Sequence, residues 1–193
     1  MDEEGALTAA ARELSARLLA SDPNRLRHVT RVAAQAARYA PTVDPRRRDA
    51  LIAAAWLHDI GYVPALRDTG FHPVDGARYL RAQGWPDEVC ALVAHHSGAR
   101  YIAAERGIDE VLRDFTFVED EVTDALTLAD QTSGPTGHAV MDLEDRMRDM
   151  LDRHGPDSPH HRAHPRRAPY FRAVRERVAR RLDTGGPGAP NPV

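Results

Sequence analysis

The sequence contains no lysine, so all 26 of its basic residues are arginine. This absence excludes lysine chemistry, because no side chain can form a Schiff base with a carbonyl substrate or serve as an amine base. The formal net charge is only −3 over 193 residues. The overall charge therefore predicts neither nucleic-acid binding nor attachment to an anionic membrane surface.

Cysteine and long apolar runs are scarce as well. Cys90 is the one cysteine, which excludes an intramolecular disulfide, and its apolar neighbours favour a small core residue over a nucleophile. No stretch approaches 18 uninterrupted apolar residues, the length that a membrane-spanning helix needs. The acidic beginning MDEEGALTAA lacks the pattern of a signal peptide. We therefore expect a cytoplasmic protein that does not bind membranes.

Strand signals and internal repeats are also missing, whereas apolar residues recur every three to four positions along most of the chain. This periodicity predicts an all-α fold in one domain. The expected helices lie at about 5–20, 24–40, 46–58, 72–83, 86–96, 119–131, 139–153 and 172–181. The expected organisation is a domain at 1–153 with its core at about 24–135, a Pro/His-rich loop and C-terminal helix packed on it at 154–182, and a disordered tail at 183–193.

The stretch AAAWLHDIGY, residues 53–62, places His58 and Asp59 at the end of an almost wholly apolar helix. Both groups are costly to bury unless they have partners. Two adjacent side chains can face one cation only at a helix end, where the backbone leaves regular helical geometry. Gly61 suits the position just past such an end. The helix is therefore interpreted as a core strut that presents two metal ligands.

Further histidines and an aspartate stand near apolar stripes of successive helices. Buried polar groups need partners, and several that arrive from different helices suggest one another, with a metal ion between them. Imidazole and carboxylate ligands without cysteine suit iron, manganese, zinc, nickel or cobalt. The predicted metal ligands are His28, His58, Asp59, His72, His95, His96 and Asp130.

The order His28, His58-Asp59, Asp130 resembles the HD superfamily of metal-dependent phosphohydrolases. RLRHVTRVAAQAARYA looks like the first histidine helix of that superfamily, and AAAWLHDIGY looks like its signature dyad. The resemblance spans about residues 24–135. It implies a helical bundle with one or two divalent transition-metal ions at its centre, iron first among them. It also implies a small phosphorylated substrate, by default a nucleotide, and no nucleic-acid partner.

The segment HPVDGARYLRAQGWPDEVCALVAHHSG looks like the insert of binuclear members, in which two histidines bind a second metal. These are His72 and His95, with His96 as neighbour or further ligand. The chain is similar in this respect to bacterial diadenosine tetraphosphate hydrolases of the HD group, and distantly to HD-GYP phosphodiesterases. It departs from the latter because SGARYIAAERG, without a GYP motif, follows His96. Tyr62 also stands where HD-type deoxynucleotide 5′-phosphatases carry an acid.

The resemblance implies that Asp59 bridges two ions beside His58 and that a bridging water becomes the nucleophile. Arg31 and Arg100 are the arginines predicted to hold further phosphates in bidentate contact. The residues after Asp130, namely Gln131, Thr132 and Ser133, are candidates either for substrate contact or for helix capping.

Two alternatives share this ligand pattern. The first is a mixed-valent di-iron oxygenase of the HD type, although Ala99 or Arg100 stands where a lysine often marks the inositol-type enzymes. The second is a non-catalytic nucleotide-sensing module. Four further histidines are left out of the predicted site as part of a polar loop: His154, His160, His161 and His164. The oligomeric state is open.

Overall fold

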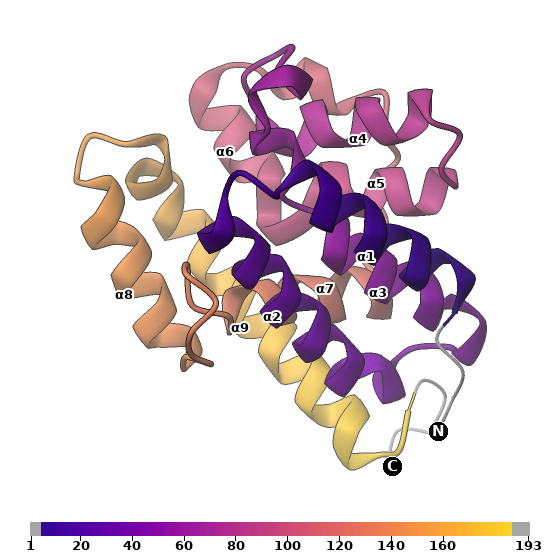
Figure 1. Ribbon diagram of the computed structural model, residues 1–193. Coiled ribbons are helices and arrows are strands. Elements are labelled where there is room, and N and C mark those ends of the chain that lie inside the picture. The colour runs from indigo at the N-terminus through magenta and orange to yellow at the C-terminus, as the bar shows by residue number, and fades with distance from the viewer. Residues whose placement is uncertain (1–4, 187–193) are drawn as a thin grey trace.

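The computed structural model describes residues 5–186, and all regular secondary structure in this range is helical (Figure 1). The all-α prediction is confirmed. The α-helices are α1 (Ala6–Leu18), α2 (Pro23–Tyr39), α3 (Arg48–Leu57), α4 (His72–Ala82), α5 (Asp87–His95), α6 (Ala99–Arg106), α7 (Glu121–Gln131), α8 (Leu143–His154) and α9 (Pro159–Asp183). Short 3₁₀ turns are η1 (Ala40–Thr42), η2 (Pro45–Arg47), η3 (Ile60–Tyr62), η4 (Pro64–Leu66), η5 (His96–Gly98) and η6 (Asp109–Leu112). Within the described residues, no helix combines the length and the apolarity needed to cross a membrane.

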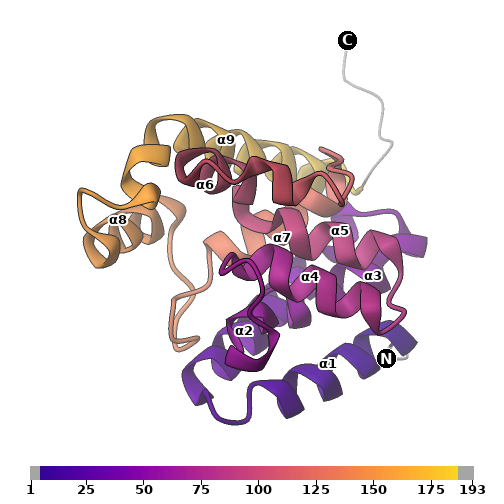
Figure 2. The same ribbon diagram turned by 90° about the horizontal axis from the view of Figure 1, so that it is seen from above.

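Helix α3 lies inside the bundle, as its apolar sequence predicts, and packs against α1, α2, α5 and α7. Figure 2 shows α7 in the middle of the molecule, with α1 and α2 along one side and α9 along the opposite side. The alanines at 53–55 are fully buried, and their small side chains allow neighbouring helices to approach closely. Leu51 and Leu57 fill the space between them. This packing fixes the direction in which the end of α3 points.

The prediction of a Pro/His-rich loop between residue 154 and the helix at 172–181 is wrong from Pro159 onward, because α9 already begins there and runs for 25 residues. Proline is favourable at that first position, and Ser158 caps the helix by accepting a hydrogen bond from the His161 N–H at 3.1 Å. Pro165 and Pro169 each remove a backbone hydrogen bond inside the helix. The buried face of α9 offsets this loss because it packs on α6, α7 and α8. Of the predicted tail, residues 187–193 lie outside the described residues.

Candidate metal centre

His58 and Asp59 lie at the end of α3, where the chain leaves the helix. His58 still has helical angles, with φ −58° and ψ −30°, but Asp59 leaves the helix with φ −106° and ψ 5°. The two residues are 0% and 3% exposed, respectively, so neither side chain can be satisfied by bulk water. Their partners must come from other elements of the fold.

Gly61 allows α4 to bring its first residue, His72, up to this dyad. A Cβ atom at position 61 would lie 2.0 Å from the His72 carbonyl oxygen and 2.7 Å from the Gly76 backbone nitrogen. Gly61 does not have the positive φ of a helix-ending glycine. The expected reason for this glycine is therefore corrected: it permits a close backbone approach between η3 and α4.

A sharp turn after α5 places His96 beside the His58-Asp59 dyad. Ser97 and Gly98 both have left-handed backbone angles, with φ 50° and 66°, and the chain reverses there into α6. The Ser97 hydroxyl donates a short hydrogen bond to Asp130 at the end of α7. His28, in the middle of α2, faces the same aspartate. Five separate helices thus contribute side chains to one buried cluster.

The cluster has two halves that meet at Asp59. On one side, Asp59 Oδ2 lies 3.7 Å from His28 Nε2 and 3.5 Å from His58 Nε2. Asp130 Oδ1 completes this half, at 3.0 Å from His28 Nε2 and 3.9 Å from His58 Nε2. On the other side, Asp59 Oδ1 lies 3.4 Å from His72 Nε2 and 3.8 Å from His96 Nε2. Each carboxylate oxygen of Asp59 therefore faces a different pair of imidazoles.

Backbone carbonyls orient three of these imidazoles. The Nδ1 atoms of His28, His58 and His96 lie 2.9, 2.8 and 2.7 Å from the carbonyl oxygens of Gly134, Ala55 and Val93, respectively. A proton on each Nδ1 leaves the Nε2 lone pair facing the cluster, which is the arrangement of metal-binding histidines. His58 Nε2 is buried and has no hydrogen-bond partner among the described residues. A divalent transition-metal ion fits this orphaned atom and its carboxylate neighbours.

The local electrostatics favour the protonation states that metal binding requires. Burial would raise the pKa of Asp59, but His58 and Arg25 together with His72 hold that pKa well below its usual range. Burial, followed by repulsion from His58, lowers the pKa of His96 to about 4. These groups are therefore a carboxylate and a neutral imidazole at neutral pH.

His28 and Asp130 form a pair in which the proton stays on the imidazole. Burial lowers the pKa of His28, but the hydrogen bond to Asp130 outweighs it and leaves this pKa raised. Burial would raise the pKa of Asp130, yet His28 and His58 hold it well below the usual range. A cation that binds here would displace the proton of His28, so binding at this half is coupled to proton release.

The cluster forms the floor of a cavity of about 620 Å³. Arg25 reaches into it from α2, with its Nη1 atom 2.6 Å from Asp59 Oδ2 and its guanidinium 4.0 Å from the centre of the Tyr62 ring. The Tyr62 ring stacks on His72 at 3.9 Å. Sequence reasoning missed Arg25, although its spacing of three from His28 places both on one helix face.

Three predicted site residues do not join the cluster or line this cavity. His95 turns the other way, and its Nε2 lies 2.8 Å from the Phe115 carbonyl oxygen on the side of a separate cavity. Arg31 donates to the Gly137 carbonyl oxygen at 3.2 Å. Arg100 lies over aromatic rings, 4.2 Å from that of Phe117. The preference for His95 over His96 is thereby corrected, because adjacent residues at the end of α5 point to opposite sides.

The residues after Asp130 divide between the two expected roles. Gln131 lines the cavity, with its Nε2 atom 3.2 Å from Asp130 Oδ2. Thr132 and Ser133 instead donate to backbone carbonyl oxygens one turn earlier, at 2.7 and 2.8 Å, and so stabilise the end of α7.

Two of the histidines left out of the predicted site also line the cavity. His154 ends α8 and His160 begins α9, and their rings stack at 3.9 Å. His161 and His164 do not line it. Sequence analysis did not identify this pair, because the prolines near His160 predict a loop. The position of His160 is set by helix α9, which that prediction leaves out.

The family model of the HD domain matches residues 25–153. The chain belongs to the HD domain family. HD domains form a superfamily of metal-dependent hydrolases. Two buried His/Asp groups fit a divalent metal site of this kind: one is His28, His58 and Asp130, and the other is His58, Asp59 and His96. No curated protein and no solved structure shows significant similarity to the chain. Resemblance to the two binuclear branches of the HD superfamily stays a prediction, and residues from 154 onward lie outside the matched HD domain.

Proposed function

We propose that this HD domain protein is a metal-dependent phosphohydrolase that cleaves a phosphoester or phosphoanhydride bond of a nucleotide. The observation that carries the proposal is the position of Asp59, whose two oxygens face two separate pairs of imidazole Nε2 atoms. This arrangement is suited to a carboxylate that is shared by two cations.

The donor set divides into two groups. His28, His58, Asp59 and Asp130 would hold one ion, and Asp59, His72 and His96 would hold the other. When bound, such ions lower the pKa of a coordinated water and neutralise the charge of phosphoryl oxygens. Iron is the first candidate, with manganese, zinc, nickel and cobalt as alternatives, because the donors are imidazole and carboxylate without thiolate.

The chain's own residues supply orientation and charge around this centre. Arg25 holds one oxygen of Asp59 and also faces the cavity, so its remaining N–H groups are available to a phosphoryl oxygen. The carbonyl oxygens of Ala55 and Val93 keep the rings of His58 and His96 in one orientation. Turned this way, the rings need no rearrangement before a substrate binds. The cavity is within the usual size range for a ligand of nucleotide size.

The test begins with elemental analysis of the untagged full chain, purified anaerobically. We expect about two transition-metal ions per chain, followed by hydrolysis of members of a set of phosphodiesters and dinucleotides, with the nucleotide products separated by chromatography. An oxygen electrode runs in parallel when the metal is iron. Oxygen uptake without hydrolysis of any phosphoester or phosphoanhydride would replace the hydrolase by the di-iron oxygenase. Tight metal retention without any turnover would favour the nucleotide-sensing module.

Variants of the dyad test the assignment of the site. We expect that His58→Ala and Asp59→Ala each lose bound metal and phosphohydrolase activity, whereas His161→Ala, in the exposed first turn of α9, retains both. Turnover at the wild-type rate in either dyad variant would remove the central claim.

A further inference from the structure

The cavity above the candidate metal centre has a strongly cationic wall. Two carboxylates line the cavity, Asp59 and Asp130, and both belong to the floor. Five arginines line it as well: Arg25, Arg106, Arg146, Arg153 and Arg167. Cations bound on the floor would add to this excess of positive charge. An uncompensated positive cavity attracts an anion, and more strongly where water is excluded.

Arg167 is the most unusual member of this wall. Its side chain comes from α9 and is buried, with the residue only 6% exposed. No carboxylate of the described residues lies within ion-pair distance of it; its Nε and Nη2 donate instead to the Ser97 carbonyl oxygen at 3.1 and 2.7 Å. Burial lowers the pKa of Arg167 to about 10. A buried guanidinium without a counter-charge is costly unless a ligand supplies one.

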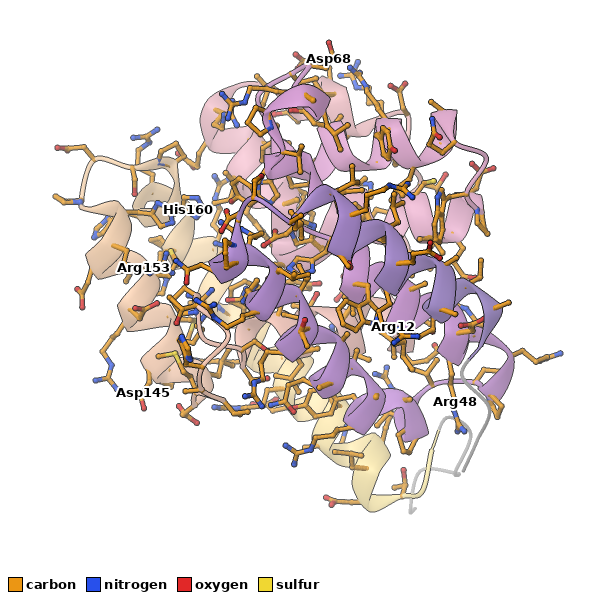
Figure 3. All side chains as sticks on the ribbon, viewed as in Figure 1. Arg12, Arg48, Asp68, Asp145, Arg153 and His160 are labelled. Carbon is orange, nitrogen blue, oxygen red and sulfur yellow. The ribbon has the colours of Figure 1, made fainter. Side chains whose placement is uncertain are left out.

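Two more arginines extend this charge along the wall. Arg106, at the end of α6, donates to the Gly70 carbonyl oxygen at 3.1 Å, and no carboxylate of the described chain pairs with it. Arg153, near the end of α8, pairs with Asp149 at 3.0 Å and is half exposed. His160 lies between these elements, and Figure 3 shows it on the α8–α9 side of the bundle with Arg153. Burial and then Arg167 lower the pKa of His160 to about 3, with smaller contributions from the other two arginines.

The wall is connected directly to the floor of the cavity. The Ser97 carbonyl accepts from Arg167, while the Ser97 hydroxyl donates to Asp130 of the candidate metal centre. A group held by Arg167 would therefore lie beside the metal ligands. His160 and Arg167 both come from the part of the chain beyond the matched HD domain, whereas Arg106 and Arg153 lie within it, so α9 completes a wall that the matched domain begins.

We propose that Arg106, Arg153 and Arg167 form a second anion subsite, which holds a phosphate group of the substrate other than the one that is cleaved. This rests on the proposed phosphohydrolase function and narrows its substrate class. The substrate would carry at least two linked phosphates, as nucleoside diphosphates, nucleoside triphosphates and dinucleoside polyphosphates do. Arginine suits this task because its planar guanidinium binds two phosphate oxygens at once.

Two non-hydrolysable probes test the subsite in the metal-loaded full chain by titration calorimetry. Methylenediphosphonate carries two linked phosphonate groups, and methylphosphonate carries one. In the double variant Arg106→Gln/Arg153→Gln, whose changes lie on exposed side chains, we expect methylenediphosphonate to lose about tenfold more affinity than methylphosphonate does. Arg167→Gln should show the same preference. Metal content is measured after each titration to exclude loss of the ions to the probe.

Arg166→Gln is the matched control. Arg166 is the neighbour of Arg167 in sequence, but it pairs with Glu105 on the surface and does not line the cavity. We expect it to bind both probes as the wild type does. The subsite would be refuted by wild-type binding in the double variant, by equal losses for the two probes, or by the same preferential loss in Arg166→Gln.

The two proposals fail in different ways. If the variants show the expected preference but no phosphoester is hydrolysed, the anion subsite stands and the phosphohydrolase function falls. If phosphoesters are hydrolysed but the double variant binds methylenediphosphonate normally, the function stands and the subsite falls.

Discussion

The orientation of single ring nitrogens decides what the buried cluster can bind. A neutral histidine that donates from Nδ1 to a carbonyl oxygen presents Nε2 as an acceptor; His58 and His96 are oriented in this way, and His28 would be once a cation displaces its Nε2 proton. Ring nitrogen lone pairs that face two ionised carboxylates are stabilised by a bound cation. The fixed tautomers are therefore a stronger indication of a metal centre than the number of histidines.

The pair His95 and His96 offers a matched test of this argument. We expect that His96→Gln loses about one metal ion per chain, because the half of the cluster shared with His72 loses an imidazole. His95→Gln should keep the wild-type metal content, since His95 faces the Phe115 carbonyl on the other side of α5. Elemental analysis of both variants checks this. Metal loss in His95→Gln alone, with the variant folded, would reverse the assignment.

His160 should make the stability of the protein depend on pH. Its pKa is about 3 in the folded state, lowered mainly by burial and by Arg167, against an ordinary value of 6.5. Between these two values the unfolded chain binds more protons, so the free energy of unfolding falls as the pH is lowered from 6.5 towards 3. The stabilising contribution is fully present above pH 6.5.

Guanidinium unfolding of the chelator-treated protein at pH 7 and pH 4.5 measures this contribution. We expect His160→Gln to lose less stability between the two pH values than the wild type loses. His161→Gln, an exposed neighbour in the same helical turn, should follow the wild type. An equal loss in wild type and His160→Gln would show that other groups account for the pH dependence.

The sequence predicts the members of the buried cluster better than it predicts the residues around them. His28, His58, Asp59 and Asp130 follow from their order and from the apolar helices that carry them. The choice of His96 over His95 could not follow, because it depends on the left-handed angles of Ser97 and Gly98. The arginines of the cavity wall were missed because a chain with 26 arginines gives no local signal for the few that are buried.

At the scale of the element, helix ends do the positioning. The dyad directly follows α3, His72 begins α4, and His96 begins η5 directly after α5. The long periodic helices were predicted within a few residues of their observed bounds. Helix α9 was only partly predicted, because its prolines favour a loop locally while its contacts with α6, α7 and α8 favour a helix. Tertiary packing decides this conflict, and no local pattern reveals it.

Gly61 should be irreplaceable because of the close contact between η3 and α4. We expect Gly61→Ala to lower the free energy of unfolding by about 2 kcal/mol or more, since the new Cβ would overlap the His72 carbonyl oxygen and force backbone movement. His72 would move with it, so metal content should fall as well. Denaturant unfolding and elemental analysis measure the two effects.

Gly76→Ala is the control on the other side of the same contact. Its Cβ would lie 3.2 Å from the Gly61 nitrogen and 3.3 Å from Ile60 Cγ1, so small movements accommodate it. Alanine also favours the helix by about 1 kcal/mol relative to glycine. A loss of stability in Gly76→Ala as large as that in Gly61→Ala would contradict the steric explanation.

At the scale of the whole molecule, α9 packs on the matched HD domain and contributes side chains to the cavity wall. One half of α9 carries His160 and Arg167, and the other half is fixed to α7 through Asp124. The structure places two arginines of this second half, Arg177 and Arg181, on a carboxylate that is fully buried. This attachment fixes α9 to α7, in addition to the packing of α9 on α6 and α8.

Asp124→Asn tests how strongly this attachment stabilises the molecule. Asp124 accepts from Arg177 Nε at 2.8 Å and from Arg181 Nη1 at 2.7 Å, and it is 0% exposed. Its neutralisation leaves two partly buried guanidinium groups without their counter-charge. We expect the free energy of unfolding to fall by about 3 kcal/mol.

Glu119→Gln is the control for that measurement, because Glu119 also pairs with Arg177, at 3.1 Å, but at the surface. Such an exposed pair contributes less than about 1 kcal/mol, so this variant should unfold close to the wild type in denaturant. Equal losses in the two variants would mean that the charge of Arg177, and not the burial of Asp124, determines the effect. A small loss in both would show that the apolar face of α9, with Phe171 and Val174, holds the helix in place without the ion pairs.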